Sequence, residues 1–307
     1  KRQLGKNGPM VSNICFGAWP IGGGMGKVDQ TQAIKTIHSA IESGVNFFDT
    51  AEGYNTSEMV LGKALEGKRH NIVLASKLSG EDHSVGHIQN AINHSLKVLK
   101  TDYIDIYQLH TPQPKWPIED TMSELVKLKQ EGKILHIGLS NYSVEETISA
   151  AACTAIQSSQ PRYNLIFNNE EKATLEFCYQ NGLGIMAHSV LAKGLLTGKY
   201  KAGHIFEEDD ERRLFNFFRG TLFDVINKLV QELNSWAIER NRNVTQLAIA
   251  WVLAQRPVTS AIVGMKTLEQ VEQARLSSEW DLTQSELGEV SNIIGTFKPK
   301  WVKDPVP

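Results

Sequence analysis

The chain has 307 residues, of which 41% are hydrophobic and 21% charged, and its formal net charge at neutral pH is −2. This balance is ordinary for a globular protein with a large core, and it gives no electrostatic reason to expect nucleic acid or an anionic membrane as a partner. No apolar run approaches the roughly 18 residues that cross a bilayer, so no membrane partner is expected from hydropathy either.

Short β-rich runs alternate with helical patterns along the chain. A strand is predicted at 12–17, and the helix after it is capped by Asp29, with Gln32 three residues on, and ended by Gly44. The second strand covers 45–48 and leads into Asp49. Later strands are predicted at 72–76, 104–108, 134–138, 155–159, 183–187 and 259–263. Later helices are predicted at 57–66, 84–100, 119–131, 144–152, 170–180, 224–240 and 245–255.

This alternation predicts the fold class. Eight strands, each but the last clearly followed by a helix, indicate parallel strands with helical crossovers. Eight such units in about 300 residues favour a closed (β/α)8 TIM barrel, which we expect to span residues 1–307 as one domain. The start of the chain, near Leu4 and Val11, is expected to form a β-hairpin at the barrel bottom.

Two segments interrupt the rhythm. Segment 200–222 is charged and then aromatic, and a loop of this length in a compact domain is usually a lid, a binding loop or disordered. The glycine-rich stretch 21–27 lacks the spacing of a phosphate-binding loop, and we interpret it as a flexible loop at the barrel mouth.

No pattern predicts a metal site or a disulfide. His83 and His87 have helical metal-pair spacing, but Gly86 lies between them and no third ligand follows, so we expect surface residues. The cysteines are odd in number and form no paired motif, which favours a reducing, cytoplasmic setting. They are Cys15, Cys153 and Cys178.

Polar or aromatic side chains follow nearly every predicted strand. Because the carboxyl ends of barrel strands converge on one face, where active sites are built, we expect these residues to form one site. They are Trp19, Asp49, Tyr54, Lys77, His110, Ser140, Asn141, Gln160, His188, Lys193, Gly264 and Lys266.

Four of these residues suggest acid–base chemistry. Tyr54 has an ordinary pKa of about 10, and a neighbouring Lys77 ammonium would stabilise the phenolate and lower that pKa. Asp49 would hold Lys77 charged and oriented, and His110 would donate a hydrogen bond that positions a carbonyl oxygen. Such a group protonates a developing alkoxide, but a redox cofactor must supply the hydride.

Three motifs resemble the aldo-keto reductase family. The run from Gly44 to Tyr54 is similar to the signature that carries the family's catalytic Asp and Tyr, here Asp49 and Tyr54. The run Leu74-Ala75-Ser76-Lys77 matches the segment of the catalytic Lys, and Thr101 to His110 matches the segment that ends in the catalytic His. The resemblance covers nearly the whole chain and implies NADPH-dependent reduction of an aldehyde or ketone.

The resemblance also implies an NADP site. Ser140, Asn141 and Gln160 resemble the residues that hold the nicotinamide carboxamide. The loop after the seventh strand resembles the one that crosses the pyrophosphate, and it contributes His188, Ser189, Leu191, Lys193, Gly194 and Leu195. The segment after the eighth strand resembles the one that binds the adenosine 2′-phosphate, and it contributes Gly264, Met265, Lys266, Gln270 and Gln273. Thr267 and Gln270 have the spacing of a capping box, so a helix is expected to start there, and its N-terminus would suit a phosphate.

Two features of the site depart from the family pattern or stay open. His188 lies where relatives usually have a larger aromatic that stacks on the nicotinamide. Candidate substrate walls are aromatic, and they suit sugars, aryl aldehydes or quinones alike. They are Trp19, Trp116, Phe215 and Phe218.

Two alternative functions are kept open. Some members of the resembled superfamily are NADPH-binding, redox-sensing subunits of potassium channels. A Schiff-base aldolase that uses Lys77 is the second alternative, since barrels host that chemistry too. It leaves Tyr54, Gln160 and the Lys266 segment unexplained. The sequence indicates no oligomeric state.

Overall fold

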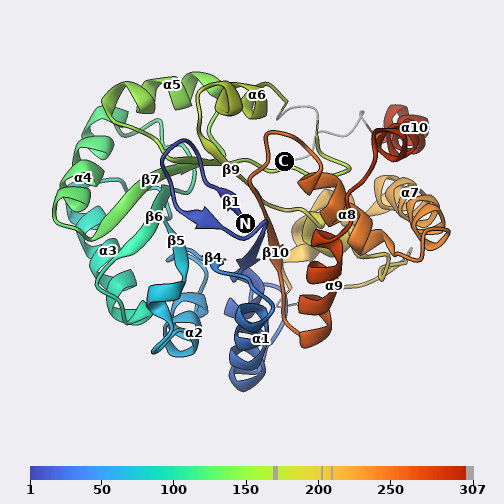
Figure 1. Cartoon of the computed structure of the whole chain (residues 1–307), viewed down its shortest axis with the longest axis horizontal. Coiled ribbons are helices and arrows are strands. Elements are labelled where there is room, and N and C mark those ends of the chain that lie inside the picture. Colours follow the sequence, from blue (N-terminus) through green and yellow to red (C-terminus); the bar gives the residue numbers. More distant parts are fainter. Residues whose placement is uncertain (169–171, 202, 209, 302–307) are drawn as a thin grey trace.

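The structure is a computed structural model that describes residues 1–168, 172–201, 203–208 and 210–301. Eight parallel strands close into a barrel in which β10 pairs with β3 and the other strands pair in chain order (Figure 1). They are β3 (Ile14–Gly17), β4 (Phe47–Asp49), β5 (Val73–Leu78), β6 (Ile104–Leu109), β7 (Ile134–Ser140), β8 (Ser158–Gln160), β9 (Gly184–Ala187) and β10 (Ser260–Gly264). The predicted TIM barrel is confirmed.

Helices surround this barrel (Figure 1). They are α1 (Gln30–Glu42), α2 (Ser57–Ala64), α3 (Val85–Leu99), α4 (Ile118–Gln130), α5 (Val144–Cys153), α6 (Lys172–Gln180), α7 (Gly220–Ile238), α8 (Val244–Leu253), α9 (Leu268–Ser278) and α10 (Gln284–Trp301). The Asp29 carboxylate accepts a hydrogen bond from the backbone N–H of Gln32 at 2.9 Å, so the predicted cap of α1 is confirmed. Residues 170 and 171 of the predicted helix 170–180 lie outside the described residues.

Near the end of the chain, only the start of α9 at the Thr267 cap was predicted, not its extent, and α10 was not predicted. In α9 the buried residues are Val271, Ala274 and Ser277, so its apolar face is narrow and its sequence periodicity is weak. The helix α10 contains Gly288 and Gly295, which are poor helix formers. It nevertheless packs against α7 and buries apolar side chains there, so tertiary contacts stabilise a helix that its own propensity does not predict.

The barrel interior follows from the period-two alternation of strand side chains. Its lower layers are apolar and include Phe47, Val73, Ile106 and Met186, close to the beginnings of their strands. The hairpin β1 (Arg2–Gln3) and β2 (Met10–Val11) lies at this end, and Leu4 and Val11 are fully buried with that cluster. The predicted hairpin at the barrel bottom is therefore confirmed.

Both interrupting segments are ordered in their described parts. Met25 forms a β-bridge with Asp210, and the backbone N–H of Glu211 donates to the Gly24 carbonyl. Short 3-10 turns follow at η4 (Glu211–Leu214) and η5 (Asn216–Phe218). This backbone pairing ties the 21–27 loop to the 200–222 segment, and Met25 of that loop lines the cavity at the barrel mouth.

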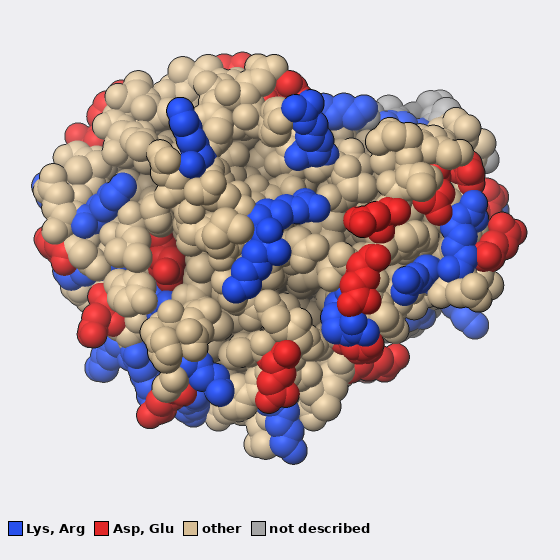
Figure 2. Space-filling view, viewed as in Figure 1, with Lys and Arg blue, Asp and Glu red and all other residues tan. Residues whose placement is uncertain are grey.

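Charges of both signs are mixed on the surface of the protein. Figure 2 shows Lys and Arg interspersed with Asp and Glu on the visible face, with no large area of one sign. No helix in the described ranges is long and apolar enough to cross a bilayer. Among the same residues no three His, Cys, Asp or Glu side chains cluster as a metal site requires. His83 is buried, which corrects its expected surface position, and His87 is half-buried.

Candidate active site

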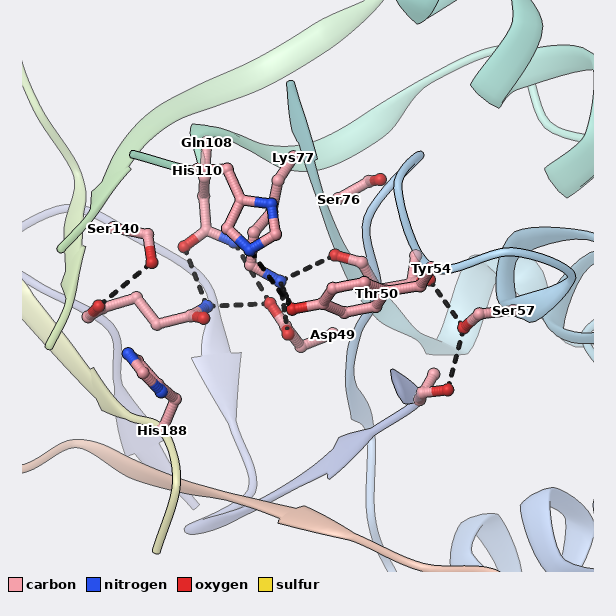
Figure 3. Close-up of polar contacts among 12 residues, drawn as sticks. Asp49, Thr50, Tyr54, Ser57, Ser76, Lys77, Gln108, His110, Ser140 and His188 are labelled. Carbon is pink, nitrogen blue, oxygen red and sulfur yellow. Dashed lines mark hydrogen bonds and ion pairs between the residues drawn. The ribbon is translucent and has the colours of Figure 1, made fainter. Parts of the chain in front are cut away.

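The four residues predicted to carry the acid–base chemistry lie together and are called the tetrad: Asp49, Tyr54, Lys77 and His110. Asp49, Lys77 and His110 follow the interior residues Phe47, Ala75 and Gln108 by two positions each, so their side chains point to the barrel axis above the apolar layers. Figure 3 shows these side chains converging with Tyr54, which comes from the loop after β4.

Lys77 lies at the centre of the tetrad and is fully buried. Its Nζ donates to Asp49 Oδ2 at 2.7 Å, to the Thr50 carbonyl at 2.8 Å and to the Tyr54 hydroxyl at 3.4 Å (Figure 3). Burial alone lowers the pKa of Lys77, but the Asp49 carboxylate and the Tyr54 oxygen outweigh it and hold that pKa above its ordinary value. Lys77 is therefore an ammonium ion whose three protons are all used.

The pKa of Tyr54 corrects an expectation. Burial raises this pKa, the Lys77 ammonium lowers it, and the net result lies above the ordinary value of tyrosine rather than below it. The Lys77 charge lowers the pKa of Tyr54 as expected, but the increase caused by desolvation is larger. Tyr54 consequently keeps its proton at neutral pH, which suits a proton donor.

The Tyr54 loop is held from both sides. The Ser57 hydroxyl bonds to the Thr50 hydroxyl at 2.8 Å and donates to the Ala18 carbonyl at 2.9 Å (Figure 3). Gly22 passes so close that a Cβ there would lie 2.1 Å from the Tyr54 carbonyl oxygen. Only glycine fits this approach, and the loop is thereby packed against the 3-10 turn η1 (Trp19–Gly22).

His110 faces Tyr54 from the end of β6. Its Nε2 lies 3.4 Å from the Tyr54 hydroxyl, and its Nδ1 lies 2.8 Å from the Ser79 hydroxyl. Burial, aided by the Lys77 charge, lowers the pKa of His110 to about 3. The imidazole is therefore neutral, and it hydrogen-bonds rather than adding a second positive charge.

A buried amide pair completes the shell of Asp49. Gln108 Nε2 donates to Asp49 Oδ1 at 3.1 Å, and Gln160 Nε2 donates to the same oxygen at 2.8 Å (Figure 3). Sequence reasoning missed Gln108. The available signal was its register: it lies between Ile106 and His110 in steps of two, so an inward-facing position in a buried strand carries a polar residue.

A cavity of about 590 Å³ opens above the tetrad. Three of the four tetrad residues line it, and Lys77 lies behind them. Twelve of the fourteen predicted cofactor residues also line it: Ser140, Asn141, Gln160, His188, Ser189, Leu191, Lys193, Gly194, Gly264, Lys266, Gln270 and Gln273. The structure thus brings residues from six predicted βα loops to one cavity.

Two predicted cofactor residues lie elsewhere. Leu195 and Met265 are buried in the apolar core and do not line the cavity, because their side chains point away from the loops that carry them. Any contact they make with a ligand in the cavity is limited to backbone atoms.

The substrate walls need a larger correction. Trp19 lines the cavity, but Phe218 is buried against Tyr200 and Phe206, and Trp116 is tied to the Glu81 carbonyl outside the lining. Phe215 reaches the site indirectly, through Lys193.

Lys193 lies between two aromatic rings at the mouth. Its Nζ lies 3.7 Å from the ring centre of Trp19 and 4.2 Å from that of Phe215. Such contacts stabilise an ammonium ion electrostatically. Burial lowers the pKa of Lys193 to about 8. The backbone of Lys193 is left-handed, with φ +55°, as is that of Ser189, so this loop holds an uncommon conformation that is typical of functional sites.

His188 is fixed by hydrogen bonds at both ring nitrogens. Asn141 Nδ2 donates to the His110 carbonyl at 3.0 Å, which leaves Asn141 Oδ1 to accept from His188 Nε2 at 2.8 Å. The Nδ1 of His188 lies 2.9 Å from the Ser189 hydroxyl. Burial lowers the pKa of His188 to about 3, so a neutral ring with a defined tautomer lines the cavity.

Cations gather at the far end of the cavity. Lys199, Arg212 and Lys266 all line it. Burial and the neighbouring Arg212 and Lys199 charges lower the pKa of Lys266. Its Nζ donates to the Met25 carbonyl at 2.6 Å, and Arg212 is paired with Asp210. Sequence reasoning missed Lys199 and Arg212, because nothing in a charged loop distinguishes an inward-pointing cation from a solvated one.

Two hydrogen bonds fix the turn into α9 beside these cations. The Thr267 hydroxyl accepts from the Gln270 backbone N–H at 3.3 Å, while Gln270 Oε1 accepts from the Lys266 N–H at 2.6 Å. The predicted capping box is therefore formed on one side only. Its second bond is displaced by one residue, to Lys266, and fixes the backbone that carries the lysine.

A closed parallel barrel with a polar cavity at the carboxyl ends of its strands has the layout of a TIM-barrel enzyme. A model of the aldo/keto reductase family matches residues 13–294. The chain belongs to this family, whose members are oxidoreductases that in general reduce carbonyls with NAD(P)H.

Individual relatives agree with this assignment. Aldo-keto reductase YhdN of Bacillus subtilis is 33% identical over 318 residues, covering 99% of this chain and 95% of the relative. A solved structure of the glycerol dehydrogenase AKR11B4 from Gluconobacter oxydans is 31% identical, with a TM-score of 0.87 over 100% of this chain and 97% of that one. A protein from Arabidopsis thaliana named as a probable voltage-gated potassium channel subunit beta is 31% identical, covering 89% of each chain.

Proposed function

We propose that this protein reduces an aldehyde or ketone to an alcohol with NADPH, and that Tyr54 is the general acid. The observation that carries the proposal is the position of the Tyr54 hydroxyl. It lies at a cavity wall, 3.4 Å from the Lys77 ammonium and 3.4 Å from His110 Nε2. A carbonyl oxygen in the cavity can meet both the tyrosine proton and the imidazole.

The cavity fits a phosphorylated dinucleotide on the grounds of charge. Lys199, Arg212 and Lys266 line the cavity, and within the part of the chain that the structure describes only Arg212 of these three has a carboxylate partner. Burial, and after it the Arg212 and Lys199 charges, lower the pKa of Lys266, so an anion bound beside Lys266 would be attracted by all three cations. The N-terminus of α9 adds N–H groups, and we assign the 2′-phosphate to this end.

We assign the nicotinamide to the part of the cavity that lies over the tetrad. The amides of Asn141 and Gln160 and the Ser140 hydroxyl line that part of the cavity and suit a carboxamide. His188 provides a flat, neutral ring beside them. Lys193 and Gly194 line the same cavity, and we assign the pyrophosphate to the loop that carries them.

The residues then divide the chemistry between them. The bound cofactor supplies a hydride to the carbonyl carbon. Tyr54 donates its proton to the oxygen, which develops negative charge as the hydride arrives. The Lys77 ammonium stabilises the phenolate that remains, and Asp49 keeps Lys77 charged and in place. Neutral His110 holds the carbonyl oxygen against the tyrosine proton.

The two alternatives make different demands on the site. A Schiff-base aldolase needs Lys77 as a free amine. In this structure the pKa of Lys77 is raised, and all three protons of its ammonium group form hydrogen bonds. A redox-sensing channel subunit finds support in the Arabidopsis relative. Such a protein would bind NADPH in the same cavity, so the distinction is one of turnover.

A carbonyl panel assayed by loss of NADPH absorbance tests the proposal. The panel should contain simple aldehydes, aryl aldehydes, quinones and sugars, with polyols and NADP assayed in the oxidation direction because one structural relative is a glycerol dehydrogenase. Tyr54→Phe should lower kcat at least ~100-fold while NADPH binding stays nearly intact. Near-normal turnover by that variant contradicts the assignment of Tyr54, and binding without turnover in the parent favours the redox-sensing alternative.

A further inference from the structure

We propose that Gln108 is a positioning residue that holds the Gln160 amide with its oxygen towards the nicotinamide, so that the protein recognises the N–H of the carboxamide. The inference rests on the proposed function, because it takes Gln160 as a contact of the nicotinamide. Gln108 itself does not line the cavity, whereas Gln160 does. Gln108 therefore acts through Gln160.

The hydrogen bonds among three side chains fix the orientation of both amides. Asp49 Oδ1 accepts from Gln108 Nε2 at 3.1 Å and from Gln160 Nε2 at 2.8 Å. Gln160 Nε2 also donates to Gln108 Oε1 at 3.1 Å. An ionised carboxylate only accepts hydrogen bonds, so both amides must turn their NH2 groups to Asp49. The three bonds form a closed triangle.

This triangle uses both protons of the Gln160 NH2 group. One goes to Asp49 and the other to Gln108, and the atom left for the cavity is Oε1, an acceptor. Reversing the amide would place its oxygen against two other acceptor oxygens. Without Gln108 the hydrogen bond from Gln160 Nε2 to Gln108 Oε1 is lost. The Gln160 amide is then held only by its hydrogen bond to Asp49 and can rotate.

The barrel makes room for Gln108. It is fully buried on β6, beside Gly138 on the neighbouring strand β7. A Cβ at Gly138 would lie 2.9 Å from Gln108 Cγ and 2.6 Å from Ser158 Oγ. A glycine in a strand interior weakens the strand, and here it allows the close approach of a long polar side chain. The glycine at position 138 therefore leaves space for the Gln108 amide, a polar group that core packing alone does not require.

An acceptor at Gln160 recognises an N–H donor on the cofactor. The carboxamide of NADPH has such a donor, and the 3-acetylpyridine analogue of NADPH replaces it by a methyl group. Leaving a buried acceptor unpaired typically lowers affinity by roughly 5- to 150-fold. The Kd of the 3-acetylpyridine analogue divided by the Kd of NADPH therefore reports how firmly Gln160 Oε1 is held towards the carboxamide.

The experiment measures this ratio by fluorescence titration in four proteins: the parent, Gln108→Leu, Gln160→Leu and the double variant. Gln108→Leu should reduce the ratio by about 2- to 13-fold, the range that one neutral hydrogen bond is worth. It should cause no further change in the Gln160→Leu background, because its effect passes through that amide. Ile106→Val, a fully buried change on the same strand, is the control for general loosening and should leave the ratio unchanged.

A second variant keeps the test independent of stability. In Gln108→Glu the new carboxyl lies beside Asp49, so its pKa is raised. Protonated at low pH, it donates to Asp49 and accepts from Gln160 as the parent amide does, and the ratio should be parental. At higher pH it ionises, repels Asp49, and the ratio should fall, while the parent ratio stays constant.

The outcomes separate two failures. A parent that binds neither dinucleotide refutes the proposed function. A parent that discriminates, together with Gln108→Leu and Gln108→Glu proteins that discriminate equally well at every pH, refutes only the role of Gln108. The same conclusion follows if Gln108→Leu lowers the ratio equally with and without Gln160, or if the parent ratio is near one.

Discussion

The Lys77–Asp49 pair allows stability and catalysis to be separated. The two side chains are buried, and Nζ lies 2.7 Å from Oδ2. Lys77→Met leaves the Asp49 carboxylate buried without a counter-charge, and breaking a buried pair in this way costs about 3–5 kcal/mol. At roughly 2.1 cal/mol/K per residue, unfolding this 307-residue chain has an entropy of about 0.64 kcal/mol/K. The loss therefore lowers Tm by roughly 5–8 °C.

The double variant Lys77→Met/Asp49→Asn removes both charges. Its Tm should recover to within about 3 °C of the parent value, because replacing a whole buried pair is close to neutral. Turnover should not recover, since Tyr54 then lacks the one neighbour that lowers its pKa most, and kcat should remain at least ~100-fold below the parent.

Differential scanning calorimetry and NADPH oxidation measure the two effects on the same preparations. Turnover that returns together with Tm in the double variant would show that the Lys77 charge is dispensable for the reaction. A single Lys77→Met variant with parental Tm would show that Asp49 tolerates burial without its counter-charge at no cost in stability. Either result refutes the reasoning on which the variant was chosen.

Other predictions concern the cofactor and pH. Lys266→Ala should weaken NADPH about 10- to 150-fold in titration and leave NADH almost unchanged, because only the 2′-phosphate needs that charge; equal losses would remove Lys266 from that site. NADPH affinity should fall between pH 7 and 9 as Lys193, with a pKa of about 8, loses its proton, and a Lys193→Met protein that keeps this pH dependence excludes Lys193 as its source. His188→Tyr should bind NADPH at least as tightly as the parent, since a phenol buries more apolar area; a large loss would mean that the bonds of His188 matter more than its ring. His110 has a folded-state pKa of about 3 against 6.5 unfolded, so its contribution to stability is present above pH 6.5 and declines as pH falls towards 3; His110→Asn should flatten that decline in urea titrations, and an unchanged slope would assign it to other groups.

Local sequence signals predicted the barrel because each βα unit repeats the same pattern. Alternation of strand and helix recurs eight times, so an error at one boundary does not alter the fold. The extent of α9 and the whole of α10 were missed because they lack that support: α9 has a narrow apolar face, and α10 contains two glycines. Their stability comes from neighbours far away in sequence.

The candidate site divides in the same way. Asp49 and Lys77 lie at the carboxyl ends of their strands and His110 directly follows one, and a barrel brings such positions together whatever the loops do. Arg212 comes from a long loop whose path depends on pairing with Met25, which no local pattern encodes. The pKa of Tyr54 was mispredicted because the sequence shows its charged neighbour but not the burial that outweighs it.

Closure of the barrel by β10 against β3 has a consequence for folding in the cell. Ala261 pairs with Ile14, so the first strand of the barrel cannot find one of its two neighbours until the chain has been synthesised as far as β10. At about 5–20 residues per second the wait is roughly 12–50 s. During that interval β3 presents an unsatisfied edge, which is a site for aggregation. Newly made chains are therefore most vulnerable before the last strand emerges from the ribosome, and chaperone dependence should be greatest at that stage of synthesis.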